Sequence, residues 1–241
     1  MSIMDIFAQI VEAIKNVSWS TILPAIASIW VAITATYALH TWKDQMRAQK
    51  HIEFMDELTD TVHEYIQAME APIQILKFAK IGIQAYSETE SLQGKNSKNA
   101  GVIVYIEKNG KADQIQLNEY LDKVRPIKSR MNSLAVKGQV LGFDNYKQCY
   151  DACTMLAWSY GQLEAFAVLI GSAHLNWQNQ EVEQFLDKVM TVDAKMIKDN
   201  LEKQSSVFLE YVRQTYQILL TKKRKRMVLF LRTAWERVKK R

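Results

Sequence analysis

The sequence is poor in the residues that break helices and build turns. Of its 241 residues, only 8 are glycine, 3 are proline and 2 are cysteine. Two cysteines exclude a disulfide scaffold, and so little glycine and proline argues against a collagen-like chain, a turn-rich β-sandwich or an α/β enzyme with phosphate loops. Because 48% of the residues are hydrophobic and 24% are charged, the chain can bury a core. We therefore expect a mainly α-helical protein with long helices.

The short motifs that identify common enzymes are also missing. There is no G-x-x-x-x-G-K-[ST], G-x-G-x-x-G, H-E-x-x-H or G-x-S-x-G sequence to mark a nucleotide, dinucleotide, zinc-protease or esterase site. Cys149 and Cys153 have the i, i+4 spacing of a helix, but no histidine lies near them in the sequence. We interpret them as packing thiols rather than metal ligands. No enzyme activity, catalytic residue, cofactor or metal is predicted.

A long stretch near the N-terminus carries no charge. No Lys, Arg, Asp or Glu lies between Lys15 and Lys43, and the segment 19–42 begins and ends with tryptophan. A helix of this length covers about 34 Å, close to the roughly 30 Å hydrocarbon core of a bilayer, and tryptophan favours both interfaces. A signal peptide needs a basic start and a small-residue cleavage site, which these flanks lack. We expect residues 19–42 to form a retained transmembrane helix.

The flanking charges predict the orientation of this helix. Lys43, Arg47 and Lys50 follow it, whereas Lys15 alone precedes it, so the positive-inside rule places the bulk of the chain in the cytoplasm. The predicted location is the inner (plasma) membrane, with the N-terminus outside. Residues 1–18 carry an apolar stripe that suits an interfacial amphipathic segment, although a frayed extension of the span fits the same pattern.

Small side chains line one face of the predicted span. They recur at spacings of three and four, at Ala25, Ser28, Ala32 and Ala35. Small faces let helices approach closely within a bilayer, so these residues are candidates for packing between spans. The expected partners are therefore the lipid bilayer and either further copies of the chain, as a homo-oligomer, or another protein.

The predicted cytoplasmic domain, residues 43–221, begins with an amphipathic or coiled-coil helix. Its apolar residues alternate by three and four, at Met55, Leu58, Val62, Tyr65 and Met69. The juxtamembrane stretch 42–58 resembles that of small bacterial membrane proteins, some of them encoded in mobile or phage-defence islands. The stripe predicts a helical bundle below the membrane.

Residues 102–117 interrupt the helical pattern after a polar loop at 87–101. Val102, Val104 and Ile106 alternate with their neighbours, and Asn109-Gly110 precedes a second apolar run. Alternation around Asn-Gly predicts a β-hairpin. A two-stranded ribbon is marginal alone, so it would dock on the helices, pair with another copy or sense a ligand. We interpret it as a surface insertion.

Three further helical stretches complete this domain, and the first covers residues 118–136, bent or restarted at Pro126. Residues 146–177 have few charges, with Glu164 alone between Asp151 and Trp177, and this invites a second membrane span. A second span would carry the basic C-terminus outside, against the positive-inside rule. We therefore expect the buried central helix of a bundle, with Glu164 at an edge or paired. Residues 180–220 lack Gly and Pro and predict one long helix, antiparallel to the one that begins at Lys43.

The C-terminal tail holds most of the positive charge. Residues 222–241 contain ten Lys or Arg and one Glu, whereas the whole chain has a net charge of +5. Such a basic amphipathic tail favours an anionic lipid surface. Nucleic acid is a less favoured partner, because the tail lacks a recognised binding fold, and a solvated helix is the third alternative. The predicted lipid-surface residues are Lys222, Lys223, Arg224, Lys225, Arg226, Phe230 and Trp235.

These features favour a non-enzymatic, single-pass, membrane-anchored scaffold whose cytoplasmic helical domain binds a protein partner or its own copies. The alternative is an oligomeric membrane-disrupting effector of the toxin or phage-defence type. In that case the small-residue face of the span would assemble copies into a pore or a depolarising lesion, and overexpression would arrest growth.

Overall fold

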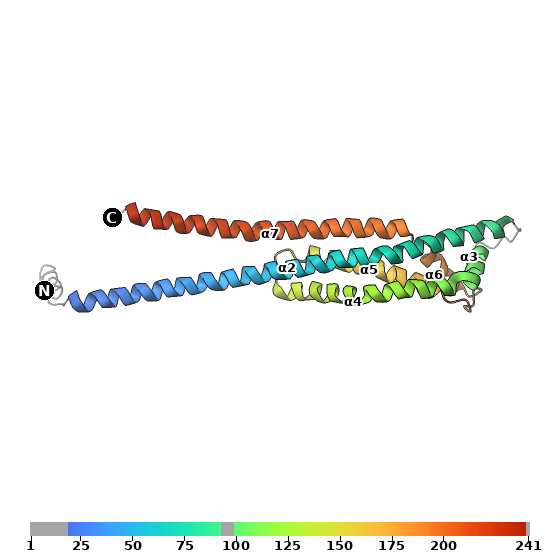
Figure 1. Ribbon diagram of the computed structural model, residues 1–241, viewed down its shortest axis with the longest axis horizontal. Coiled ribbons are helices and arrows are strands. Elements are labelled where there is room, and N and C mark those ends of the chain that lie inside the picture. The colour runs from blue at the N-terminus through green and yellow to red at the C-terminus, as the bar shows by residue number, and fades with distance from the viewer. Residues whose placement is uncertain (1–18, 93–98, 240–241) are drawn as a thin grey trace, which may run out of the picture. The chain divides into compact units, whose positions relative to one another are not determined.

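The protein is helical throughout the part of the chain that its computed structural model describes (Figure 1). Described are the backbone of residues 19–92 and 99–239, and side chains within 23–89, except at 25, and within 99–219. The predicted mainly α-helical class is confirmed, while the predicted interfacial segment at 1–18 lies outside the described residues. The elements are α2 (Trp19–Leu92), α3 (Ala100–Tyr105), the π-helix η1 (Ile106–Gly110), α4 (Lys111–Leu141), α5 (Lys147–Ile170), α6 (Gln180–Met190) and α7 (Ala194–Lys239).

The chain divides into two compact units, Met1–Ile52 and Glu53–Arg241. In the first unit, the described part of α2 exposes its apolar side chains. In the second unit, α2 from Glu53 onward contributes to a hydrophobic core that also draws on α4, α5, α6 and α7. The predicted stripe is confirmed, since each of its members is buried: Met55, Leu58, Val62, Tyr65 and Met69.

Within the second unit, α2, α4, α5 and α7 form a four-helix bundle with alternating directions. Phe54 of α2 stacks on Phe143, just after α4, at 5.2 Å between ring centroids, and lies 6.5 Å from the ring of Tyr146 at the start of α5. The neighbouring Asp56 accepts a hydrogen bond from Tyr216, late in α7. The beginning of α2 in this unit therefore lies beside the end of α4, the start of α5 and the later part of α7. This is up-down-up-down connectivity.

The predicted β-hairpin at 102–117 is wrong. These residues form α3, η1 and the start of α4, and no strand occurs in the described ranges 19–92 and 99–239. Val102, Tyr105 and Ile106 are buried, which is helical spacing of three and one rather than the alternation of a strand. Burial of this face outweighs the β-propensity of the Val-Ile-Val run, because propensity is the weaker term.

Asn109-Gly110 is not a turn, since both residues lie inside the π-helix η1. An added Cβ on Gly110 would come within 2.0 Å of the carbonyl oxygen of Ile170 at the end of α5. Glycine is therefore needed for close packing of two helices and not for a positive φ. Helix packing, and not a hairpin turn, therefore explains the glycine of the Asn-Gly dipeptide.

Replacing Gly110 by alanine is expected to destabilise the bundle by about 1–3 kcal/mol, the usual range for overpacking, because backbone rather than a flexible side chain blocks the new Cβ. Gly161→Ala is the matched control. Gly161 is also inside a helix, but nothing lies within 4 Å of its Cβ position, so this change should stabilise the fold by up to about 1 kcal/mol. Thermal unfolding followed by circular dichroism measures both. Shifts of the same sign would contradict the packing at Gly110.

Helix α5 supplies much of the buried core, as expected, but it ends at Ile170 rather than continuing to Trp177. It contacts α4, α6 and α7, and the buried hydroxyl of Tyr65 in α2 donates to its Leu156 carbonyl at 2.8 Å. Among the described residues it is the helix long and apolar enough to cross a membrane, yet half of that apolar window is buried inside the protein. Glu164 lies half-exposed on it, 3.8 Å from the Arg125 guanidinium of α4, which matches the prediction of an edge or paired position.

The long helix predicted over 180–220 is interrupted. Helix α6 ends at Met190 and α7 begins at Ala194, where an Asp193 carboxylate oxygen accepts from the Lys195 N–H at 3.1 Å. Asparagine and aspartate are favoured at such N-terminal caps because they satisfy free N–H groups. The break has no Gly or Pro to signal it.

The predicted loop at 87–101 is shorter than expected, since α2 continues to Leu92 and α3 begins at Ala100.

Candidate functional site

The first candidate surface is the apolar part of α2 in the first unit. From Leu23 to Trp42 no described side chain carries a formal charge, and the large apolar ones are exposed on all sides of the helix. A helix that is hydrophobic all round is ordinarily buried in a protein core or a bilayer. The exposed large side chains are Leu23, Ile26, Ile29, Trp30, Val31, Ile33, Tyr37, Leu39 and Trp42.

The serine and threonine hydroxyls described in this segment are satisfied within the helix itself. Each donates to a carbonyl four residues earlier, at 2.8–2.9 Å, so none of the four requires water or a neighbouring protein group. Such back-bonding is how serine and threonine are tolerated in hydrocarbon. The donors are Ser28, Thr34, Thr36 and Thr41.

The predicted packing residues of the span fall on this same helix. Ser28, Ala32 and Ala35 are exposed, whereas the side chain of Ala25 lies outside the described residues. Their spacing within an unbroken α-helix does put them on one face. Whether they contact another span stays a prediction.

The predicted lipid-surface residues lie on α7, whose backbone is helical to Lys239. Their side chains lie outside the described residues, so their contact with lipid stays a prediction. The residues concerned are Lys222, Lys223, Arg224, Lys225, Arg226, Phe230 and Trp235.

An aromatic cluster closes the end of the bundle at which α2 enters the second unit. The rings of Phe143 and Tyr146 stack at 5.7 Å, and Tyr211 meets Tyr146 edge-on at 5.9 Å. Beside this cluster, burial and the hydrogen bond to the Asp56 carboxylate raise the pKa of Tyr216 to about 12. The Tyr216 hydroxyl is therefore protonated at neutral pH and remains a donor to Asp56. The cluster thereby joins α2, α5 and α7.

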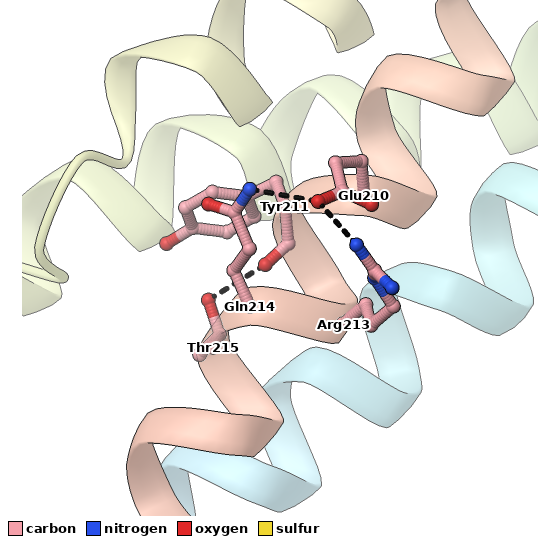
Figure 2. Close-up of polar contacts among 5 residues, drawn as sticks. All are labelled: Glu210, Tyr211, Arg213, Gln214 and Thr215. Atoms are coloured by element: carbon pink, nitrogen blue, oxygen red, sulfur yellow. Dashed lines mark hydrogen bonds and ion pairs between the residues drawn. The ribbon is translucent and has the colours of Figure 1, made fainter.

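On the outer side of α7, polar side chains bond to one another along the helix (Figure 2). Glu210 accepts from Arg213 and from Gln214, each at 2.8 Å, and Thr215 donates to the Tyr211 carbonyl at 3.0 Å. Hydrogen bonds from Arg213 and Gln214 lower the pKa of Glu210. These pairs are three or four residues apart on one helix, so they support α7 rather than form a site.

Among the described residues, no three His, Cys, Asp or Glu side chains come together as metal ligands. Cys149 and Cys153 are buried, and a hydrogen bond between the thiols together with burial raises the pKa of Cys149. The half-buried amine of Lys80 donates to the Met190 carbonyl at 2.6 Å, at the C-terminus of α6, and this partial burial lowers the pKa of Lys80. Both arrangements fit packing and capping roles.

A second surface, on α5, escaped the sequence reasoning. The helix was expected to be buried, yet Trp158 is 62% exposed, and Met155 and Val168 are exposed as well. A glycine in mid-helix, Gly161, lies about one turn after Trp158, and its Cβ position is open. The sequence feature that could have indicated this exposed surface is a glycine and a tryptophan close together in a charge-poor helix.

No protein-family model, curated protein or solved structure matches the chain.

Proposed function

We propose that this protein is a non-enzymatic, single-pass membrane scaffold. The first part of α2 anchors it in the inner membrane, and the helical bundle of the second unit binds a partner protein or further copies in the cytoplasm. The observation that carries the proposal is the exposed, charge-free apolar stretch of α2 from Leu23 to Trp42. Exposing nine large apolar side chains on one helix to water is costly, at about 1.5–3 kcal/mol for each.

The polar groups of the same stretch support a lipid environment. Because the hydroxyls of Ser28, Thr34, Thr36 and Thr41 bond within the helix, these four side chains bring no unsatisfied hydroxyl into hydrocarbon. Lys43, Arg47 and Lys50 follow at its C-terminal end and favour a cytoplasmic bundle. The burial of half of α5 favours a single crossing over two.

Reporter fusions at three positions test the orientation. Fusions after Arg241 and in the turn at Gly142, between α4 and α5, should both report the cytoplasm, and a fusion at Met1 should report the outside. Gly142 is suitable because it ends α4 with a positive φ of 67° and is exposed. A cytoplasmic report at Gly142 with an external report at Arg241 would mean that α5 crosses the membrane. Cytoplasmic reports from all three positions would exclude the anchor.

A further inference from the structure

The joint between α6 and α7 lies in a segment whose sequence favours one continuous helix. Residues 180–220 contain no Gly or Pro, yet α6 ends at Met190 and α7 begins at Ala194. Thr191, just after α6, already has right-handed helical angles, with φ −75° and ψ −18°. The local sequence therefore does not impose the break, and contacts from elsewhere in the chain maintain it.

Lys80 of α2 supplies such a contact at the end of α6. In a continuous helix the Met190 carbonyl would accept from the Ala194 N–H, four residues later. In the structure it accepts instead from the Lys80 ammonium, with 2.6 Å between Nζ and the oxygen. The same amine lies 5.4 Å from the centroid of the Phe166 ring in α5. Lys80 thus occupies the hydrogen-bonding position that would join the two helices.

The last carbonyls of α6 show where the two arrangements compete. The Lys188 carbonyl accepts from the Thr191 hydroxyl at 2.7 Å, and the Val189 carbonyl accepts from the Val192 N–H at 3.1 Å. These two carbonyls are satisfied locally, and Met190 is the next. Because backbone carbonyls are nearly always paired, the donor that Met190 takes decides whether the helix ends or continues.

Helix α6 is attached to the bundle by a small buried face. Of its 11 residues, Leu186 and Val189 are buried, whereas Phe185 is 42% exposed. The helix packs on α5, and the Asn99 amide donates to the Asp187 carboxylate at 3.3 Å. Local opening costs least where few apolar side chains are buried. Helix α6 can therefore detach while α2, α4, α5 and the rest of α7 stay packed.

We infer that Lys80 is a latch that holds α6 on the bundle, and that released α6 joins α7 as one continuous helix. Release transfers the Met190 carbonyl from the Lys80 ammonium to the Ala194 N–H. The backbone rearrangement is confined to the short joint, where Val192 and Asp193 take up helical angles. The absence of Gly and Pro, which gave no sign of the break, is what allows the joined state.

Release changes the surface of the bundle. It exposes the apolar stripe of α6, formed by Phe185, Leu186 and Val189, and the part of α5 on which α6 packs. The latch would thereby regulate the partner binding that the proposed function assigns to the bundle. This consequence rests on the proposed function, whereas the latch itself does not depend on the membrane anchor.

Thiol labelling of the full chain measures the release. Val189→Cys places a thiol in the buried face of α6, where a maleimide reaches it once α6 detaches. Adding Lys80→Met should raise the labelling rate at least tenfold, because methionine keeps an unbranched side chain but leaves the Met190 carbonyl without its charged donor. Lys77→Met is the matched control. Lys77 is an exposed lysine about one turn earlier on α2, and its replacement should not change the rate.

The natural cysteines report unfolding of the whole bundle in the same samples. Cys149 and Cys153 are both fully buried in α5, so neither should be labelled in any of these variants. Peptide mass spectrometry separates their labelling from that of Val189→Cys. Labelling of all three sites with Lys80→Met would overturn the latch, because the entire bundle, and not α6 alone, would then depend on Lys80.

A proline substitution tests whether released α6 joins α7. Ala194 is the first residue of α7, a position where proline is favoured. In a continuous helix, proline there would remove the bond to the Met190 carbonyl and clash with it. Ala194→Pro should therefore return the labelling rate of the Val189→Cys, Lys80→Met chain to its value with Lys80 present. Gln180→Pro, at the first residue of α6, is the control and should leave the raised rate unchanged.

Two results would overturn the inference. The first is an unchanged labelling rate of Val189→Cys when Lys80 is replaced by methionine. The second is a raised rate that Ala194→Pro does not lower, because α6 would then detach by fraying rather than by joining α7.

Membrane fractionation of the same samples separates the latch from the proposed function. A soluble chain that shows both labelling effects would overturn the anchor and leave the latch in place. A membrane-inserted chain in which Lys80→Met has no effect would overturn the latch and leave the anchor in place.

Discussion

Arginine in place of both Ile29 and Ile33 is expected to release the protein from the membrane. Both side chains are exposed, four residues apart, near the middle of the apolar segment of α2. An arginine near the centre of a span costs about 2.5–3.5 kcal/mol on insertion scales, so the pair costs about 5–7 kcal/mol. The measurement is the fraction of the chain that resists carbonate extraction and floats with membranes.

Two matched substitutions on the bundle give the control. Ile115 and Val140 are also exposed aliphatic residues, but they lie on α4 in the second unit, and arginine at both should leave membrane association unchanged. Should the Ile29→Arg, Ile33→Arg chain remain resistant to carbonate, residues 19–42 would not be the anchor. Loss from the membrane in the control variant alone would place the attachment on the bundle.

Much of the bundle could be predicted from the sequence because its signals are periodic and local. The stripe from Met55 to Met69 is buried, and so is half of the apolar window of α5, as expected of buried helical faces. Helix type was predictable wherever the apolar period continued over several turns. The same reasoning placed Glu164 at an edge, because a carboxylate is rarely buried without a partner.

The hairpin prediction failed because two local signals had tertiary causes. The Val-Ile-Val run and Asn109-Gly110 are typical of a strand and a turn. In the protein, Val102 lies in a helix and is buried in the hydrophobic core of the bundle. Gly110 allows the end of α5 to come into van der Waals contact with η1. Neither cause can be seen without knowing which helix lies opposite. The start of α7 at Ala194 was missed for a related reason, since no Gly or Pro marks it.

The exposed face of α5 shows the limit of hydropathy as a guide to burial. Composition alone cannot distinguish an apolar helix face that is buried in the core from one that is exposed on the surface. Trp158 and Cys153 belong to the same uncharged stretch, yet the first is exposed and the second is buried. The distinction depends on how α4 and α7 are placed around α5, which is set by the whole bundle.

Neutralising the basic tail is expected to weaken its binding to anionic lipid. The tail follows Tyr216, which lies beside Asp56 at the end of the bundle where α2 enters the second unit.

The substitutions are the five basic residues changed together to glutamine, in a fragment of residues 43–241 that contains the whole bundle. Each charge near an anionic surface contributes about 1 kcal/mol at low salt, so binding to phosphatidylserine vesicles should fall by at least a hundredfold there. The residues to change are Lys222, Lys223, Arg224, Lys225 and Arg226.

Salt dependence distinguishes charge from apolar insertion. The unaltered fragment should lose vesicle affinity steeply between low and physiological salt, whereas the neutralised one should respond little, because its residual binding comes from Phe230 and Trp235. Arg125→Gln and Arg130→Gln on α4 form the control, since they remove exposed charges from the bundle and should change vesicle binding little. Vesicle binding that survives neutralisation, or much tighter salt-dependent binding to DNA or RNA, would contradict the lipid assignment and favour nucleic acid as the tail's partner.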